Sequence, residues 1–382
     1  GKLTEEEGFY RGQWGISRDN YGRWLYNHNS TWIQADFFQA EDLILPGVQA
    51  RYSGLAVNLT NTAEVFSVRV NPGVNRAYLD DTLRSDGRLF RATGVSGLVA
   101  YRGDQFPAEF ANDVFVPEAA GNVVAQFALN EQGMTLQAKQ RLYEDEQWGK
   151  RDFLGSVHER FRPVHAMNGP DGALYIIDMY RGIIQDDHFL TDELREQIFQ
   201  RGLDSPVGMG RIWRVRHTAG KTSPPLALAG ASDEDLIEAL KSGNGWVRDT
   251  AQRLLLQSTA DLTRALTSVA MGDDTLAALH AIWTLHGRGE LQAESVIELA
   301  VMPDVQRQVQ VLRAGRELLS TEQILGLAES LVEAPEAVVV QLAFAMTDHS
   351  YTPAVRAALL DLLSVQSNSG YVAQAVVRAV FG

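Results

Sequence analysis

The sequence predicts a chain of two parts, an incomplete β-propeller over residues 1–217 and an α-helical solenoid of HEAT-like repeats over residues 231–382. Short apolar runs alternate with Gly, Asn, Asp and Pro before residue 220, whereas apolar residues recur at helical spacing after it. Segment 218–230 is rich in small residues and proline, as linkers are. With 382 residues there is room for two or three domains. We therefore expect a multidomain β plus α fold.

Three segments of the first part share one pattern. Each begins with a turn former, continues through aromatic or β-branched residues and ends at a polar residue six positions later. These segments are Gly22–His28, Asn112–Glu118 and Gly172–Asp178. Turn chemistry at residues 18–22 and 168–172 places a strand before two of them. The predicted unit is therefore strand, turn, strand and polar end.

Repeated units of this kind form propeller blades, each of roughly 40–50 residues. Three inner hairpins are recognisable, and the strand-like runs Glu64–Val70 and Gly97–Tyr101 could supply another. The ring is then small, irregular or incomplete. We favour an incomplete ring, with residue 1 inside a longer parent chain and another chain or segment completing the propeller.

The second part is predicted to consist of paired helices. Ser232 followed by three acidic residues marks a helix N-terminus, where negative charge is favourable. The second helices of successive pairs recur at roughly 30 residues, in the range of helical-hairpin repeats. We expect them at about Trp246–Leu256, Leu276–Leu285, Val305–Leu318, Ala337–Ala345 and Tyr371–Val380. The stack is either a docking surface or a cap packed on the first domain.

Composition excludes several classes of protein. The net charge of −14 repels phosphate backbones, so we expect no nucleic-acid partner. The absence of cysteine excludes disulfides, thiolate zinc sites and a covalently attached c-type haem in this chain. The sequence has no Gly-x-Ser-x-Gly elbow, no zinc-protease helix motif and no phosphate-binding Gly-rich loop, which disfavours hydrolases, metalloproteases, nucleotidases and Rossmann dehydrogenases.

The three polar strand ends form the candidate site. In a propeller, equivalent positions share one height and radius, so His28, Glu118 and Asp178 would surround one axis. The loops leaving these strands carry Asn29, Asn122, Tyr180 and Arg181. Such a ring could bind a polar ligand or calcium, or abstract a proton. Alternatively, these groups cap strand ends by hydrogen bonding to neighbouring backbone.

Two further clusters are candidates. Residues 69–76 place two Arg and two Asn, Asn71 and Arg76 among them, around a Pro-Gly turn that could hold an anionic cofactor. The alternative is a strand end with solvated arginines. His165 precedes the second turn and either lines the channel or is a packed structural histidine.

Several of these segments resemble a known family. Phe161–Val164 leading to Asn168–Gly182, together with Phe106–Phe110, Val114–Glu118 and Gly121-Asn122, resembles bacterial periplasmic or membrane-bound dehydrogenases related to quinoprotein glucose (sorbosone) dehydrogenase. The order of a propeller and then HEAT-like repeats is also similar to that group, in which a c-type cytochrome domain often follows.

The resemblance implies a quinoprotein-type dehydrogenase, or a component of one, that oxidises a sugar or alcohol in the periplasm or outside the cell and passes electrons to a c-type cytochrome. It implies pyrroloquinoline quinone and calcium as cofactors. The implied catalytic residues are His28, His165 and Asp178, with one of the two histidines as the base. The residues expected to hold the cofactor are Asn71, Arg76, Asn122, Tyr180 and Arg181, and those expected to hold calcium are Glu118 and Asp178.

Two other functions stay open. One is a non-catalytic scaffold in which the propeller face or the helical surface binds a protein or polysaccharide. The other is a propeller hydrolase or lyase that uses histidine and carboxylates without a quinone.

Overall fold

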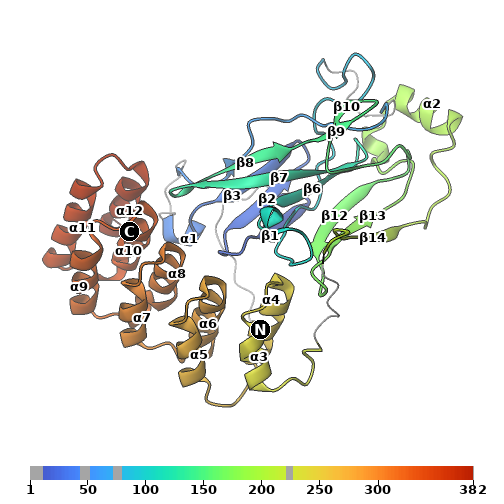
Figure 1. Ribbon diagram of the computed structural model, residues 1–382. Coiled ribbons are helices and arrows are strands. Elements are labelled where there is room, and N and C mark those ends of the chain that lie inside the picture. Colours follow the sequence, from blue (N-terminus) through green and yellow to red (C-terminus); the bar gives the residue numbers. More distant parts are fainter. Residues whose placement is uncertain (1–11, 44–51, 72–79, 221–226, 382) are drawn as a thin grey trace.

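A computed structural model describes residues 12–43, 52–71, 80–220 and 227–381 of the chain. All its strands lie in the first part of the chain, and ten of its α-helices follow one another in the second part (Figure 1). None of the described helices is long and apolar enough to span a membrane. The fold is therefore β followed by α, as predicted. Arg76 lies outside the described residues.

The first sheet is antiparallel, with its four strands in chain order. Its strands are β1 (Gly15–Arg18), β2 (Trp24–His28), β3 (Thr31–Asp36) and β4 (Val57–Asn58). The turn between β1 and β2 forms because the Asp19 Oδ1 atom accepts hydrogen bonds from the Tyr21 and Arg23 amides. Gly22 adopts a left-handed conformation (φ 79°) in this turn.

The second sheet is the largest and has the order β11-β7-β6-β5, with β8 also paired to β7. Its strands are β5 (Val99–Ala100), β6 (Val114–Glu118), β7 (Val123–Gln132), β8 (Thr135–Arg141) and β11 (Leu154–Gly155). All five residues of β6 are buried. Between β8 and β11 in the sequence, β9 (Tyr143–Asp145) and β10 (Gly149–Arg151) pair with each other as a short antiparallel ribbon.

The third sheet consists of β12 (Pro163–Asn168), β13 (Leu174–Asp178) and β14 (Arg211–Val215) in that order. The turn between β12 and β13 repeats the chemistry of the first hairpin, because the Asp171 Oδ1 atom accepts a hydrogen bond from the Ala173 amide. Helix α2 (Asp192–Gln200) lies in the connection from β13 to β14. No sheet among the described residues closes on itself.

The predicted strand pattern is confirmed at three places, since β2, β6 and β13 end at His28, Glu118 and Asp178. The expectation of a strand at Glu64–Val70 is wrong. That run forms one isolated bridge, from Glu64 to Arg91. The amide of Phe66 is instead bonded to the Asp152 carboxylate, so it is not available to a neighbouring strand.

Residues 93–97 connect the three sheets. The Val95 amide donates to the Asn29 carbonyl beyond β2, and the Ser96 amide donates to the Pro117 carbonyl in β6. The Gly97 amide donates to Val164 in β12, and the Gly97 carbonyl accepts from Ala166. This connecting segment places the ends of β2 and β6 and the start of β12 near one another.

Within residues 227–381, the helices form five successive antiparallel pairs. The first helices of the pairs are α3 (Asp233–Ala239), α5 (Thr263–Ala270), α7 (Ala293–Ala300), α9 (Thr321–Leu331) and α11 (Pro353–Val365). The second helices are α4 (Gly245–Leu255), α6 (Thr275–Arg288), α8 (Val305–Gly315), α10 (Glu336–Ala345) and α12 (Gly370–Phe381). All five predicted second helices and the Ser232 N-cap are confirmed.

The helix ends follow local sequence signals. Asp274 caps α6 by accepting the Ala277 amide, and α6 ends at Gly289 in the left-handed conformation (φ 69°). Ser320 and Gln323 form a reciprocal capping box at the start of α9. These signals lie within a few residues of each terminus, which is why the positions of these helices can be predicted from the sequence.

The helical pairs form a curved row that runs along the sheets (Figure 1). One apolar core extends through all five pairs and includes Phe38, Leu43 and Leu55 from the first part of the chain. Polar contacts follow the same boundary. The Arg102 guanidinium binds Asp249 of α4, and the Gln310 amide of α8 donates to the Tyr21 carbonyl. The row therefore packs on the sheets along one side.

Asp152 is a buried carboxylate in the β region, between β10 and β11. Its two oxygens accept hydrogen bonds from the Phe66 amide (2.8 Å) and from the Gln140 side chain (2.9 Å). Burial raises the pKa of Asp152 from 3.8 to about 6, an effect that these two donors only partly oppose. The ionised form is therefore held at a cost to stability.

We predict that Asp152→Asn changes how stability depends on pH. The cost of burying the charge is absent below about pH 4 and complete above about pH 6, so the free energy of unfolding of the wild type falls across this window by about 3 kcal/mol. Asparagine can keep both contacts if the Gln140 amide rotates. Urea unfolding at about pH 4.5 and about pH 7.5 should show the variant gaining stability relative to the wild type as pH rises. A difference that is the same at both pH values would contradict this assignment.

Candidate functional site

The Glu118 carboxylate lies at the end of β6 and is fully buried. Its Oε1 atom accepts hydrogen bonds from the amides of Thr93 (3.0 Å) and Gly94 (2.5 Å), and its Oε2 atom accepts one from Gly121. Burial raises the pKa of Glu118, while these three amides and the positive charge of Arg162 oppose the rise. Both oxygens therefore face N–H donors.

Asp178, at the end of β13, has the same kind of surroundings. Its Oδ1 atom accepts hydrogen bonds from the amides of Arg162 and Tyr180, both at 2.8 Å. Its Oδ2 atom accepts one from the Trp213 indole at 3.0 Å. The carboxylate thus joins the end of β13 to the start of β12 and to the edge strand β14.

His28, at the end of β2, has its ring contacts within its own turn. The Nε2 atom lies 3.1 Å from the Thr31 hydroxyl, and the Nδ1 atom lies 3.3 Å from the Asn29 side chain. In the part of the chain that the structure describes, His28, Glu118 and Asp178 make no hydrogen bond or ion pair with one another. The structure brings these strand ends together through backbone, by way of residues 93–97 and of Arg162, whose side chain donates to the Ala119 carbonyl.

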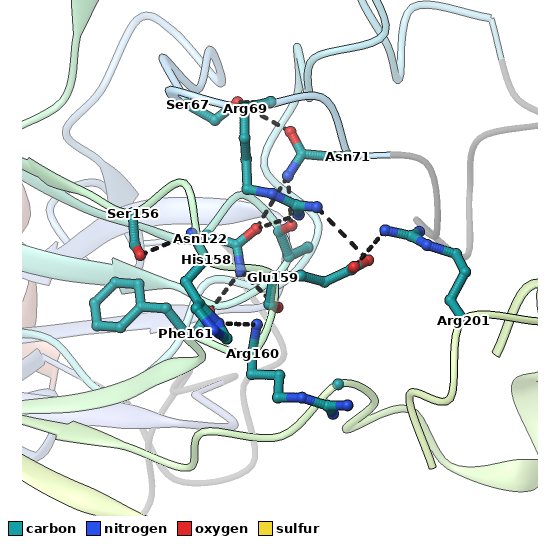
Figure 2. A network of polar contacts seen from close by, with 12 residues as sticks. Ser67, Arg69, Asn71, Asn122, Ser156, His158, Glu159, Arg160, Phe161 and Arg201 are labelled. Atoms are coloured by element: carbon teal, nitrogen blue, oxygen red, sulfur yellow. Dashed lines mark hydrogen bonds and ion pairs between the residues drawn. The ribbon is translucent and has the colours of Figure 1, made fainter. Parts of the chain in front are cut away.

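A second set of predicted residues does meet. Asn122 is fully buried in a left-handed conformation (φ 59°), and its amide group donates to the carbonyls of Glu159 and Phe161. Its oxygen accepts hydrogen bonds from Arg69 (2.9 Å) and Asn71 (3.2 Å). Figure 2 shows Arg69 and Asn71 from one segment and the backbone of Glu159 and Phe161 from another meeting at Asn122. Asn122 therefore joins the segments around residues 70, 121 and 160.

Arginines gather around this hub. Arg69 and Arg201 both approach the Glu159 carboxylate (Figure 2). Arg162 donates to three backbone carbonyls, those of Ala119, Arg181 and Gly182. Arg160 donates to the carbonyls of Gly202 and Ser205. We call Arg69, Arg160, Arg162 and Arg201 the arginine cluster.

The cluster has more positive than negative charge. The guanidinium groups of Arg69, Arg162 and Arg201 are near two carboxylates, Glu159 and the buried Glu118, whereas that of Arg160 is bonded to the Gly202 and Ser205 carbonyls. The pKa of Arg162 is lowered to about 10, mainly by burial and also by the charges of Arg69 and Arg201, while Glu159 and Glu118 oppose the shift. Burial also lowers the pKa of Arg69, with Glu159 opposing and Arg201 adding to the effect. An anion bound here would relieve the repulsion between these arginines.

The two other predicted cofactor residues lie beside the cluster. Tyr180, with a positive φ of 45°, places its hydroxyl 3.1 Å from the His158 Nε2 atom and its ring under the Arg211 guanidinium at 3.6 Å. Arg181 contributes its backbone carbonyl, which accepts from the Arg162 side chain. Sequence reasoning missed the parts played by His158, Glu159, Arg162 and Arg201. The signal for Arg162 was present, because it lies in the Phe161–Val164 motif.

His165 has different surroundings. It lies in β12 with its ring against Gly97, where an added Cβ atom would come within 1.9 Å of the Nδ1 atom. Its ring lines a cavity of about 210 Å³ that also involves Arg102, Trp246 and Asp249. Burial lowers the pKa of His165. The roles predicted for His28, His165, Glu118 and Asp178 stay predictions, and the described residues contain no group of three or more His, Asp or Glu side chains placed to hold a metal ion.

We predict that removing the Asn122 side chain destabilises the fold. Asn122→Gly keeps the left-handed backbone accessible but leaves buried donors and carbonyls without partners, at a cost of about 3 kcal/mol in the free energy of unfolding. Asn122→Ala should cost about 1 kcal/mol more, because alanine disfavours this conformation. Urea denaturation of both variants tests this. A glycine variant as stable as the wild type would show that the hub does not hold the three segments together.

Comparison with known proteins assigns the first part of the chain to a family. No curated protein matches the sequence. A family described as a domain of unknown function, DUF7133, matches residues 1–219, which contain all three sheets and the arginine cluster. The chain therefore belongs to the DUF7133 family.

Proposed function

We propose that the protein is a quinoprotein-type dehydrogenase, or a component of one, in which the arginine cluster binds the carboxylates of pyrroloquinoline quinone. The observation that carries the proposal is the gathering of Arg69, Arg162 and Arg201 around Glu159, next to the Asn71–Asn122 hub, in a protein of net charge −14. The net negative charge of the protein repels anions, so an anionic ligand is attracted specifically to a local group of positive charges. The proposed substrate is a sugar or alcohol.

The donor set fits an anionic cofactor. Arg69 and Arg201 keep 13% and 31% of their side chains exposed, so each guanidinium can reach a ligand while remaining fixed through Glu159. Guanidinium groups bind carboxylates through paired hydrogen bonds, which fixes orientation as well as affinity. Arg162 adds positive charge, and among the described residues its guanidinium bonds to backbone carbonyls and forms no ion pair with a carboxylate. When bound, the quinone supplies the acceptor for a hydride from the substrate carbon.

The chain's own residues would position this ligand and take up the proton. Asn122 holds the Arg69 guanidinium, and Asp178 holds the backbone of Arg162. His28 and His165 remain proposed bases, but neither ring contacts the arginine cluster. The His28 ring contacts Asn29 and Thr31, and the His165 ring lies against Gly97. His158 belongs to the network itself (Figure 2), and its Nε2 atom lies 3.1 Å from the Tyr180 hydroxyl. Because the His158 Nδ1 atom accepts the Arg160 amide, the neutral ring carries its proton on Nε2 and donates it to the Tyr180 hydroxyl, so His158 orients Tyr180 and does not take up a proton.

Calcium fits the predicted ligands less well. Glu118 and Asp178 direct their carboxylate oxygens at amide and indole N–H groups, as described above. A cation at these oxygens would be opposed by the positive ends of those donors. We keep calcium as an untested part of the proposal and derive no step from it.

The finer description of the fold belongs to the same proposal. The sheets are taken as blades of an incomplete propeller, supported by the three strands that end at corresponding polar residues. The helical pairs are taken as HEAT-like repeats, supported by second helices that begin at residues 245, 275, 305, 336 and 370. A periplasmic or secreted location, a c-type cytochrome as electron acceptor and a partner segment that completes the ring follow from the resemblance.

We predict that the full chain binds pyrroloquinoline quinone through the cluster. In a titration followed by absorption or calorimetry, Arg69→Ala and Arg201→Ala should each weaken binding about tenfold or more, the loss expected for a charge-assisted hydrogen bond. The matched control is Arg195→Ala, which removes a partly exposed arginine of α2 that is paired with Asp187 and not with the residues of this network. Reduction of a dye with a sugar panel then tests activity.

Absence of quinone binding by the wild type, or equal affinity in all three variants, would contradict the proposal. The result would then favour the non-catalytic scaffold, for which the specific support is that Asn71, Glu118, Asn122 and Asp178 are all engaged in contacts within the protein.

A further inference from the structure

A cavity of about 210 Å³ lies where the three sheets meet the first helical pair. Its wall is built from β1, β5 and β12 on one side and from α4 on the other, with Arg102 between them. We call it the junction cavity. We propose that the junction cavity binds one ring of a neutral sugar, held by Arg102, Asp249 and His165 and stacked against Trp246.

The polar wall of the cavity is rigid. The Arg102 guanidinium makes two hydrogen bonds of 2.8 Å to the two oxygens of Asp249 and a third, of 3.0 Å, to Asn20. The Arg102 carbonyl accepts a hydrogen bond from the Gly245 amide at the start of α4. Asp249 remains 51% exposed, so its oxygens keep acceptor capacity for hydroxyl groups. Sugar hydroxyls are recognised by fixed donors and acceptors of this kind.

His165 is available to a ligand. Within the part of the chain that the structure describes, no hydrogen-bond partner approaches either ring nitrogen of His165. Burial lowers the pKa of His165, which keeps the ring neutral at pH 7. A neutral imidazole offers one donor and one acceptor. The Nδ1 edge of the ring lies against Gly97, where any side chain would collide with it.

Apolar surface completes the cavity. Trp246, in the first turn of α4, is 37% exposed, and Met167 and Ile16 on the opposite wall are also exposed. A sugar ring has C–H faces as well as hydroxyl edges, so it matches a site with an aromatic face and a polar wall. Trp246 offers a large rigid face at little cost in side-chain entropy.

Charge and size select among ligands. Among the lining residues Arg102 and Asp249 form an ion pair and His165 is neutral, so the lining has no net charge, in contrast to the arginine cluster. The positive charge of buried Arg248, which shares the Asn20 oxygen with Arg102, lies outside the lining. The cavity of about 210 Å³ is smaller than the ~300–1,000 Å³ of sites that hold drug-sized molecules. A single sugar ring suits it better than a quinone cofactor does.

The inference takes from the proposed function only the class of ligand. None of the arginine-cluster residues lines the junction cavity, so the cavity is a separate sugar-binding site and not the place of hydride transfer. Its test contains no quinone, so a failure here is distinct from a failure of cofactor binding at the arginine cluster.

The test is calorimetric titration of the full chain with glucose and with xylose, up to about 100 mM. We expect saturable binding that Trp246→Ala and His165→Ala each weaken about tenfold or more. Trp14→Ala is the matched control, because Trp14 is 61% exposed and does not line the cavity. Thermal melts of all variants confirm that they fold. Glucuronate, which keeps the pyranose ring and carries a carboxylate at C6, should bind more weakly than glucose.

Three results would overturn the proposal. They are the absence of saturable binding by the wild type, equal binding by the folded Trp246→Ala and His165→Ala variants, and glucuronate binding at least as tight as that of glucose.

Discussion

The Glu118 carboxylate and the backbone segment that it holds are the contact on which the β region depends. Glu118 binds the amides of Thr93 and Gly94, and the next three residues then bond to the end of β2, to β6 and to β12. A buried carboxylate without such donors would be expensive, but three amides and the nearby Arg162 offset the loss of hydration. The segment runs between sheets rather than within one, so its amides need partners from several elements. One charge at a strand end thereby fixes how three separate sheets meet.

The sequence correctly predicts that Glu118 ends a strand, but it does not decide what the carboxylate binds. Glu118 and Asp178 were recognised because each ends a strand that repeats one pattern, and the structure ends β6 and β13 at these residues. Whether such a carboxylate faces a ligand or backbone amides depends on donors distant in the chain, such as Thr93 for Glu118 and Trp213 for Asp178. No local pattern encodes those donors. The same limit explains the arginine cluster, in which Arg201 comes from the end of α2 and meets Arg69 only through the fold.

The helical part was predictable because its determinants are local. Capping residues such as Ser232 and Asp274 lie one residue before the helices they begin, and apolar spacing marks the buried face throughout. The run Glu64–Val70 failed for the opposite reason. Its composition is that of a strand, but the Phe66 amide donates to the Asp152 carboxylate instead of to a neighbouring strand. The conformation of the segment is therefore set by this side-chain contact. Long-range side-chain contacts therefore override local β propensity in the first part of the chain, which is also where the candidate sites lie.

Strand β12 carries residues of both proposed sites. Arg162 immediately precedes it and belongs to the arginine cluster, while His165 lies within it and faces the junction cavity. The pairing with β13 shifts register between Pro163 and His165, and such an irregularity redirects the side chains that follow it. The Asp178 carboxylate fixes the start of β12 through the Arg162 amide, and Gly97 fixes its middle through hydrogen bonds in both directions. A short rigid strand, held at both points, thus presents a cationic site and a neutral site in two different directions. An anionic ligand and a neutral one could therefore bind the same chain without competing for the same groups.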